Sequence, residues 1–245
     1  MTNPIFNSSF NQNARTYEIH GEPMTVNGVV SKLGILAILM TASGAATWYQ
    51  FAIGNFDKVQ LLMMGGFIAG LIFALIATFA RKTAPITVSL YAFAEGAALA
   101  GLSCFFEAQF PGIAVKAISL TFLALLSMLF LYSTRIIKVT DKFRSTLLTV
   151  TISIFVFYLI SWILALFNIR IPMLYDSSML SIGFSTVICG IAAFNLLLDF
   201  DFIERATQNF FPKEYEWLGA FGMVTTLVWL YVEILHLLTK LNRNN

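Results

Sequence analysis

The sequence has 245 residues, of which 58% are hydrophobic and 11% are charged, and its mean hydropathy is +0.79. Soluble domains carry about 25% charged residues, so this composition excludes a water-soluble globule. The net charge of +2 is small and no basic stripe is interleaved with aromatic residues, which excludes nucleic acid as a partner.

The amino-terminal segment, residues 1–28, is polar and rich in Asn and Ser, and it has no periodic apolar face. These features predict a flexible tail, which we place in the cytoplasm. The first apolar run starts only after Lys32 and is long enough to span a membrane. It therefore indicates an uncleaved first span and not a signal peptide.

Counting this first run, the sequence contains seven apolar runs, each long enough to cross a hydrocarbon core of about 30 Å. They lie at about 33–53, 59–80, 85–106, 115–132, 147–167, 179–198 and 217–238. Within lipid only helices or closed barrels satisfy the backbone, and these runs lack the alternation of barrel strands. The sequence predicts an all-α polytopic membrane protein, with one domain of seven transmembrane helices over 29–245 and the lipid bilayer as its partner.

Lysines and arginines are divided unequally between the two ends of the predicted spans. Ten fall on the side of the amino terminus and five on the other side. The positive-inside rule therefore places the amino terminus in the cytoplasm and, with an odd number of spans, the carboxyl terminus outside.

Small residues recur in two of the predicted spans. Gly66 and Gly70 form a GxxxG pattern in the second span, and Ala94, Ala98 and Gly101 give the third span a small-residue stripe. Both patterns predict close helix packing.

Four carboxyl groups lie within or at the end of apolar runs, where an ionisable side chain costs roughly 2.5–3.5 kcal/mol and is a functional candidate. Glu95 is about ten residues into the third span, Glu233 is within the seventh, and Asp199 and Asp201 close the sixth. Asp199 and Asp201 are about 200° apart around a helix, so they face different neighbours. Asp201 is equally well interpreted as a residue at the headgroups, and Glu95 as a structural, hydrogen-bonded acid.

Patterns for enzymatic chemistry are missing from the sequence. Glu233 and His236 have Glu-x-x-His spacing, but no second copy accompanies them as a di-iron bundle needs. Neither G-x-S-x-G nor H-E-x-x-H occurs, and Lys240 comes too late for a retinal Schiff base. We therefore expect no enzymatic activity, no resident cofactor and no metal site.

Carboxyl groups from different helices that meet in a dry interior cannot both ionise cheaply. Such a pair shares a proton and titrates as a unit, which makes it a candidate proton sensor. Ionising the second carboxyl would push the helices apart or recruit a cation, and oxygen ligands suit Ca²⁺.

Several segments resemble the Bax inhibitor-1 family. The segment 198–203 (LDFDFI) is similar to the Tyr-Asp-x-x-x-Ile that ends the sixth helix of that family, and 230–235 (LYVEIL) is similar to the Leu-Tyr-Leu-Asp-Ile-Ile of its seventh. The segments 3–6 (NPIF), 24–30 (MTVNGVV) and 91–96 (YAFAEG) extend the likeness over nearly the whole chain. The set resembles the bacterial, YccA-type branch.

The resemblance implies a seventh helix that is central in the bundle and a proton-regulated Ca²⁺ leak in the bacterial cytoplasmic membrane. Asp199 and Glu233 match the two sensor aspartates of the family, with glutamate in the second position. We expect Glu95 to be a further acid of the ion pathway and Arg81 to be a counter-charge.

Asp199 and Glu233 are expected at different depths in the membrane. Asp199 ends the sixth span, whereas Glu233 lies sixteen residues beyond Trp217, or roughly 24 Å along a helix. Either tilt or an extension of the last two helices must bring the acids level, or Glu95 is the nearer partner of Glu233.

Two other functions stay open. The YccA-type resemblance also implies a non-conducting protein whose tail modulates a membrane-bound protease or a stress response. A small-molecule transporter is disfavoured because no internal repeat is visible.

Overall fold

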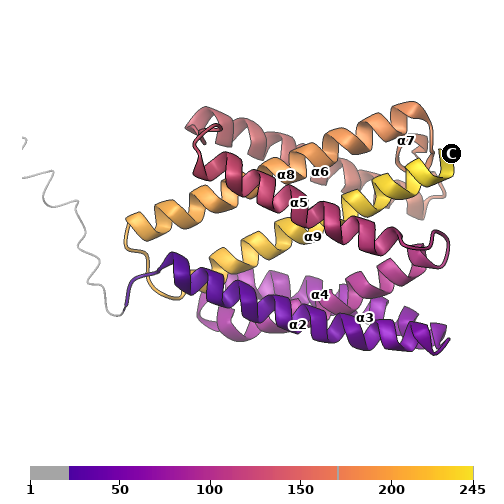
Figure 1. Cartoon of the computed structure of the whole chain (residues 1–245), viewed down its shortest axis with the longest axis horizontal. Helices are drawn as coiled ribbons and strands as arrows, with labels where there is room; N and C mark the ends of the chain where they lie inside the picture. The colour runs from indigo at the N-terminus through magenta and orange to yellow at the C-terminus, as the bar shows by residue number, and fades with distance from the viewer. Residues whose placement is uncertain (1–21, 170, 245) are drawn as a thin grey trace, which may run out of the picture.

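A computed structural model describes residues 22–169 and 171–244. Seven long helices, each apolar enough to cross a membrane, run between the two ends of an elongated bundle (Figure 1). They are α2 (Val26–Ala52), α3 (Phe56–Phe79), α4 (Ala84–Glu107), α5 (Ile113–Ser133), α6 (Asp141–Leu166), α8 (Met179–Gln208) and α9 (Tyr215–Asn244). A 3₁₀ turn, η1 (Arg81–Thr83), precedes α4, and the short helix α7 (Pro172–Tyr175) precedes α8. The predicted all-α, seven-span architecture is confirmed.

Polar residues extend several helices beyond the predicted apolar runs. Helix α2 begins at Val26, inside the segment assigned to the tail, and the Thr25 hydroxyl accepts a hydrogen bond from the Gly28 amide at its start. Helix α8 continues for ten residues beyond the predicted limit of 198 and ends at Gln208. The predicted flexibility of residues 1–21 concerns a segment outside the described residues.

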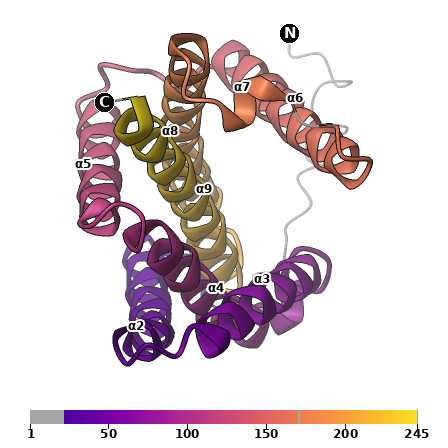
Figure 2. The same ribbon diagram turned by 90° about the vertical axis from the view of Figure 1, so that its right-hand side faces the viewer.

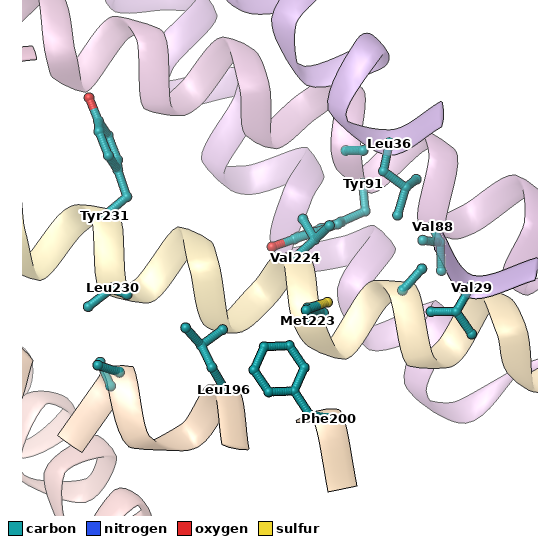
Figure 3. Close-up of a cluster of buried hydrophobic side chains, with 14 of the residues drawn as sticks. Val29, Leu36, Val88, Tyr91, Leu196, Phe200, Met223, Val224, Leu230 and Tyr231 are labelled. Atoms are coloured by element: carbon teal, nitrogen blue, oxygen red, sulfur yellow. The ribbon is translucent and has the colours of Figure 1, made fainter. Parts of the chain in front are cut away.

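Helix α9 occupies the centre of the bundle. It packs against α2, α4, α5 and α8, and it crosses between the group α2–α4 and the group α5, α6 and α8 (Figure 2). Buried side chains such as Leu36, Tyr91 and Leu196 approach Val224 and its neighbours on α9 from three helices (Figure 3). The central seventh helix is therefore present, although α4 is the most buried span, at 61% against 50% for α9.

The α3–α4 contact is close because glycines face it. A Cβ atom at Gly66 would lie 2.6 Å from the Ala94 carbonyl oxygen and 2.8 Å from the Ala98 nitrogen. A Cβ atom at Gly70 would lie 2.6 Å from Glu95 Oε2. These distances confirm the close packing that the GxxxG pattern predicts.

Helix α6 is the least buried span, with 11% of its most apolar stretch buried and with Leu147 and Ser161 as its buried residues. It packs mainly on α8, through edge-on ring contacts that include Phe157 with Phe184 at 5.7 Å. The Asn195 amide nitrogen of α8 donates a hydrogen bond to the Thr151 hydroxyl of α6 at 2.9 Å. Because α6 buries so little apolar surface, its hydrogen bonds and ion pairs contribute a large part of the interaction that holds it to the bundle.

Candidate functional site

Glu233 lies in the middle of α9 and is 4% exposed. Its Oε1 atom accepts two hydrogen bonds, from the Tyr158 hydroxyl of α6 at 2.8 Å and from Trp229 Nε1 at 3.0 Å. Cys189 of α8 and Lys240, two turns further along α9, are the other titratable groups that interact with it. The carboxyl group of Glu233 therefore joins the least buried helix to the central one.

Asp199 occupies a different level of the bundle. A Cβ atom at Gly222 of α9 would lie 3.6 Å from Asp199 Oδ1, and Thr226 is one turn further along. These contacts precede Glu233 by seven to eleven residues, or roughly 10–17 Å along the helix. The structure therefore does not bring Asp199 and Glu233 together as a carboxyl pair.

The second carboxylate oxygen of Asp199 is unusual. Oδ2 is buried and has no hydrogen-bond partner among the described residues. A pocket of about 360 Å³, lined by Arg144, Arg205 and Asn209 among others, adjoins the same residue. Since a buried acceptor without a donor is costly, this oxygen is a candidate contact for a proton or a cation.

Glu95 faces α3 and does not pair with Glu233. It is 8% exposed, it lies against Gly70, and it interacts with Tyr91 one turn earlier on α4. In the described part of the chain no group donates a hydrogen bond to its carboxyl. Glu95 therefore lies apart from both Asp199 and Glu233.

Arg81, the expected counter-charge, lies at the end of the bundle where α9 begins. It donates a hydrogen bond to the Tyr215 hydroxyl at 2.8 Å, and its guanidinium is 5.7 Å from the centre of that ring. No ion pair within residues 22–169 and 171–244 joins it to Asp199, Glu233 or Glu95. Its role in this arrangement is to anchor the start of α9.

Asp201 has the ionic partners that Asp199 lacks. It is 7% exposed, it forms an ion pair with Arg144 of α6, and its Oδ1 accepts a hydrogen bond from Arg205 Nε at 3.0 Å. Asp199 and Asp201 thus face different neighbours, as their spacing predicts, and Asp201 is buried within the bundle. Asp201 attaches the start of α6 to α8.

A further cluster, absent from the sequence predictions, surrounds Glu216 at the start of α9. Glu216 is 1% exposed, and it accepts hydrogen bonds from Lys32 Nζ at 2.6 Å and from the Thr25 amide and hydroxyl, both at 3.0 Å. A Cβ atom at Gly28 would overlap the Glu216 carboxyl group. We call Thr25, Gly28, Lys32 and Glu216 the amino-terminal clasp.

Backbone contacts extend the clasp to the loop between α8 and α9. Pro23 forms a β-bridge with Pro212, and the Met24 amide donates to the Phe211 carbonyl at 2.7 Å. The exposed Lys213 forms an ion pair with Glu22, which lowers the pKa of the Glu22 carboxyl and raises the pKa of the Lys213 amine. The segment before α2 is therefore attached to the base of the central helix.

Together these observations define a class: a seven-span membrane protein with a central last helix and with carboxyl groups buried at separate places in the bundle. The family model described as "Bax inhibitor 1 like" matches residues 3–243. The chain therefore belongs to the Bax inhibitor 1 like family, as the resemblance in the sequence predicts. Neither the curated proteins nor the solved structures contain a match.

Proposed function

We propose that this protein is a pH-sensitive, Ca²⁺-permeable leak of the bacterial cytoplasmic membrane. The observation that carries the proposal is the placement of Asp199 and Glu233 on adjacent helices of a membrane-spanning bundle, with no ionic partner for either in the described chain. An ionisable residue inside a membrane marks an ion or proton pathway by default. The proposed role is transport, without enzymatic chemistry or a resident cofactor.

The sign of the pH response follows from the hydrogen bonds of Glu233. An ionised carboxylate accepts stronger hydrogen bonds than a neutral carboxylic acid. Protonation of Glu233 therefore weakens its bonds to Tyr158 and Trp229, and the Tyr158 bond is the one that joins the middle of α6 to α9. Because α6 has little buried surface, we expect it to move away and the leak to open as the pH falls.

Asp199 is the proposed first contact for a cation at the cytoplasmic end. Asp199 lines the same pocket as Arg144 and Arg205, and its enclosed Oδ2 has no hydrogen-bond partner among the described residues. Carboxylate oxygens are the ligands that Ca²⁺ prefers, and Glu95 would offer another carboxylate in the α4 layer. We place this end in the cytoplasm because it carries most of the lysines and arginines.

Ca²⁺ flux into liposomes that contain an indicator tests this proposal. Wild-type flux is expected to exceed that of protein-free liposomes and to rise as the pH falls from 8 to 5. Glu233→Gln, which resembles the protonated acid, is expected to give high flux with a flat pH profile, and Asp199→Asn is expected to lower the flux.

The matched control is Tyr158→Phe, which removes one hydrogen bond to Glu233 but leaves the acid titratable. It is expected to raise flux at high pH and to keep part of the pH dependence. Wild-type flux equal to that of empty liposomes at every pH would overturn the proposal.

The clasp favours a second candidate, a non-conducting protein that modulates a membrane-bound protease. A partner that pulled on the amino-terminal tail would act directly on the start of α9, through the Met24 and Glu216 contacts. Under this alternative, deletion of residues 1–21 abolishes the cellular phenotype, whereas Asp199→Asn and Glu233→Gln preserve it. The leak predicts the reverse pattern.

A further inference from the structure

A pocket of about 490 Å³ lies between the middle of α6 and the middle of α9. Phe155 and Tyr158 line it from α6, and Trp229, Glu233 and His236 line it from α9. Phe155 is 68% exposed and α6 is the least buried span, so the pocket opens sideways toward the lipid. In Figure 2, α6 and α3 stand apart on either side of α9.

The carboxyl group of Glu233 lines the pocket, and one of its two oxygens accepts no hydrogen bond from the described residues. Tyr158 and Trp229 both donate to Glu233 Oε1, whereas no described residue donates to Oε2. Oε2 is also not among the enclosed oxygens without a partner, so it is open to the pocket. Lys240 does not line the pocket. Its Nζ instead donates a hydrogen bond to the Ser185 hydroxyl at 2.8 Å.

Aromatic rings stand next to this carboxyl group. Trp229 and Tyr158 present an indole and a phenol to the same pocket, and Phe155 adds a third ring. Aromatic faces attract organic cations, and the attraction is strongest for indole and in places away from water. The remaining wall is largely apolar, with Ile154 and Val232 among the lining residues.

We propose that this pocket binds a lipophilic organic cation, an alkylamine or alkylammonium that reaches it from the bilayer. The cationic head would lie between Trp229 and Tyr158 at Glu233 Oε2, and the alkyl chain would lie along the apolar wall. A Ca²⁺ ion needs six to eight oxygen ligands, and the pocket offers one free carboxylate oxygen. An anion is excluded as the ligand, because the Glu233 carboxylate would repel it.

This inference does not depend on ion conduction, because binding is measured on purified full-length protein without an ion gradient. The probe is radiolabelled hexyltrimethylammonium in a scintillation proximity assay. We expect saturable binding that unlabelled hexyltrimethylammonium displaces. Its neutral isostere 2,2-dimethyloctane and hexanesulfonate should displace it at least tenfold less effectively.

Variants locate the binding site. Glu233→Gln is expected to weaken binding at least tenfold, and Trp229→Leu, which removes the indole ring, severalfold. Glu107→Gln is the matched control, since it makes the same change at an acid that does not line the pocket; it should bind like wild type.

The competition series on wild type needs no variant, so it decides the matter even where a variant fails to fold. Displacement by the neutral isostere as effective as by the cation would overturn the proposal, as would unchanged binding by folded Glu233→Gln. Absence of Ca²⁺ flux together with cation-selective binding would overturn the proposed leak and leave this site standing.

Discussion

Replacement of Glu216 by alanine is expected to destabilise the protein by about 3–5 kcal/mol, the usual cost of removing one partner from a buried ion pair. Glu216 is 1% exposed and accepts all three clasp hydrogen bonds from Lys32 and Thr25. Its removal leaves the Lys32 ammonium without a partner at the base of the central helix. Thermal unfolding of the purified protein in detergent, followed by intrinsic fluorescence, measures the loss.

A glycine pair in α2 provides the matched control for the clasp. Gly28→Ala places a Cβ atom on the Glu216 carboxyl group, so it should lower the unfolding temperature even though Glu216 is intact. Gly34→Ala, in the same helix, has no neighbouring atom within 4 Å and should cause no loss. Equal unfolding temperatures for the two variants would show that the clasp does not hold the bundle.

The second large effect is expected at Gly66. A methyl group there would meet backbone atoms of Ala94 and Ala98, which cannot rotate away as a side chain can. Helices α3 and α4 must then separate, and overpacking of this kind costs about 1–3 kcal/mol. SDS-induced unfolding of Gly66→Ala should therefore occur at a lower SDS fraction than for wild type.

The adjacent Gly65→Ala supplies the comparison, since no atom lies within 4 Å of the added methyl group. The same chemical change one residue away should leave the transition at or above the wild-type position. Parallel losses in both variants would mean that the close α3–α4 contact at Gly66 does not determine the effect, since the gain in helix propensity from Gly to Ala has the opposite sign.

The helices were predictable because about 20 consecutive apolar residues leave a chain in lipid few alternatives. The carboxyl-terminal end of α8 was not, since the apolar run stops at residue 198 while the helix continues to Gln208. Asp201 and Arg205 are four residues apart and pair along that extension, and Arg144 adds a partner from α6. A hydropathy profile therefore does not predict the part of a helix that is built from paired polar residues.

The acids of the candidate site were found one by one, but their partners were not. A carboxylate in an apolar run is conspicuous, whereas Tyr158 resembles the many other aromatic residues around it. Lys32 and Glu216 are separated by 184 positions, and Arg144 and Asp201 by 57. Such pairs depend on how the helices are arranged in space, which a single sequence does not specify.

The clasp explains why the segment 24–30 has its particular residues. Thr25 both caps α2 and donates to Glu216, and Gly28 leaves room for the carboxyl group of Glu216. The family-like segment 24–30 is thus a docking element for the start of α9. A pattern that looked like part of a flexible tail is attached to the central helix.

The central claim is that the charge of Glu233 controls the attachment of α6, and the distance between α6 and α3 tests it most directly. Spin labels at the lipid-exposed positions Ile152 of α6 and Ile72 of α3, with Cys104 and Cys189 replaced by alanine, report that distance in nanodiscs. The account predicts one short distance at pH 8, a longer population that grows toward pH 5, and the longer population at every pH in Glu233→Gln. A single distance that is independent of pH and identical in Glu233→Gln would contradict it.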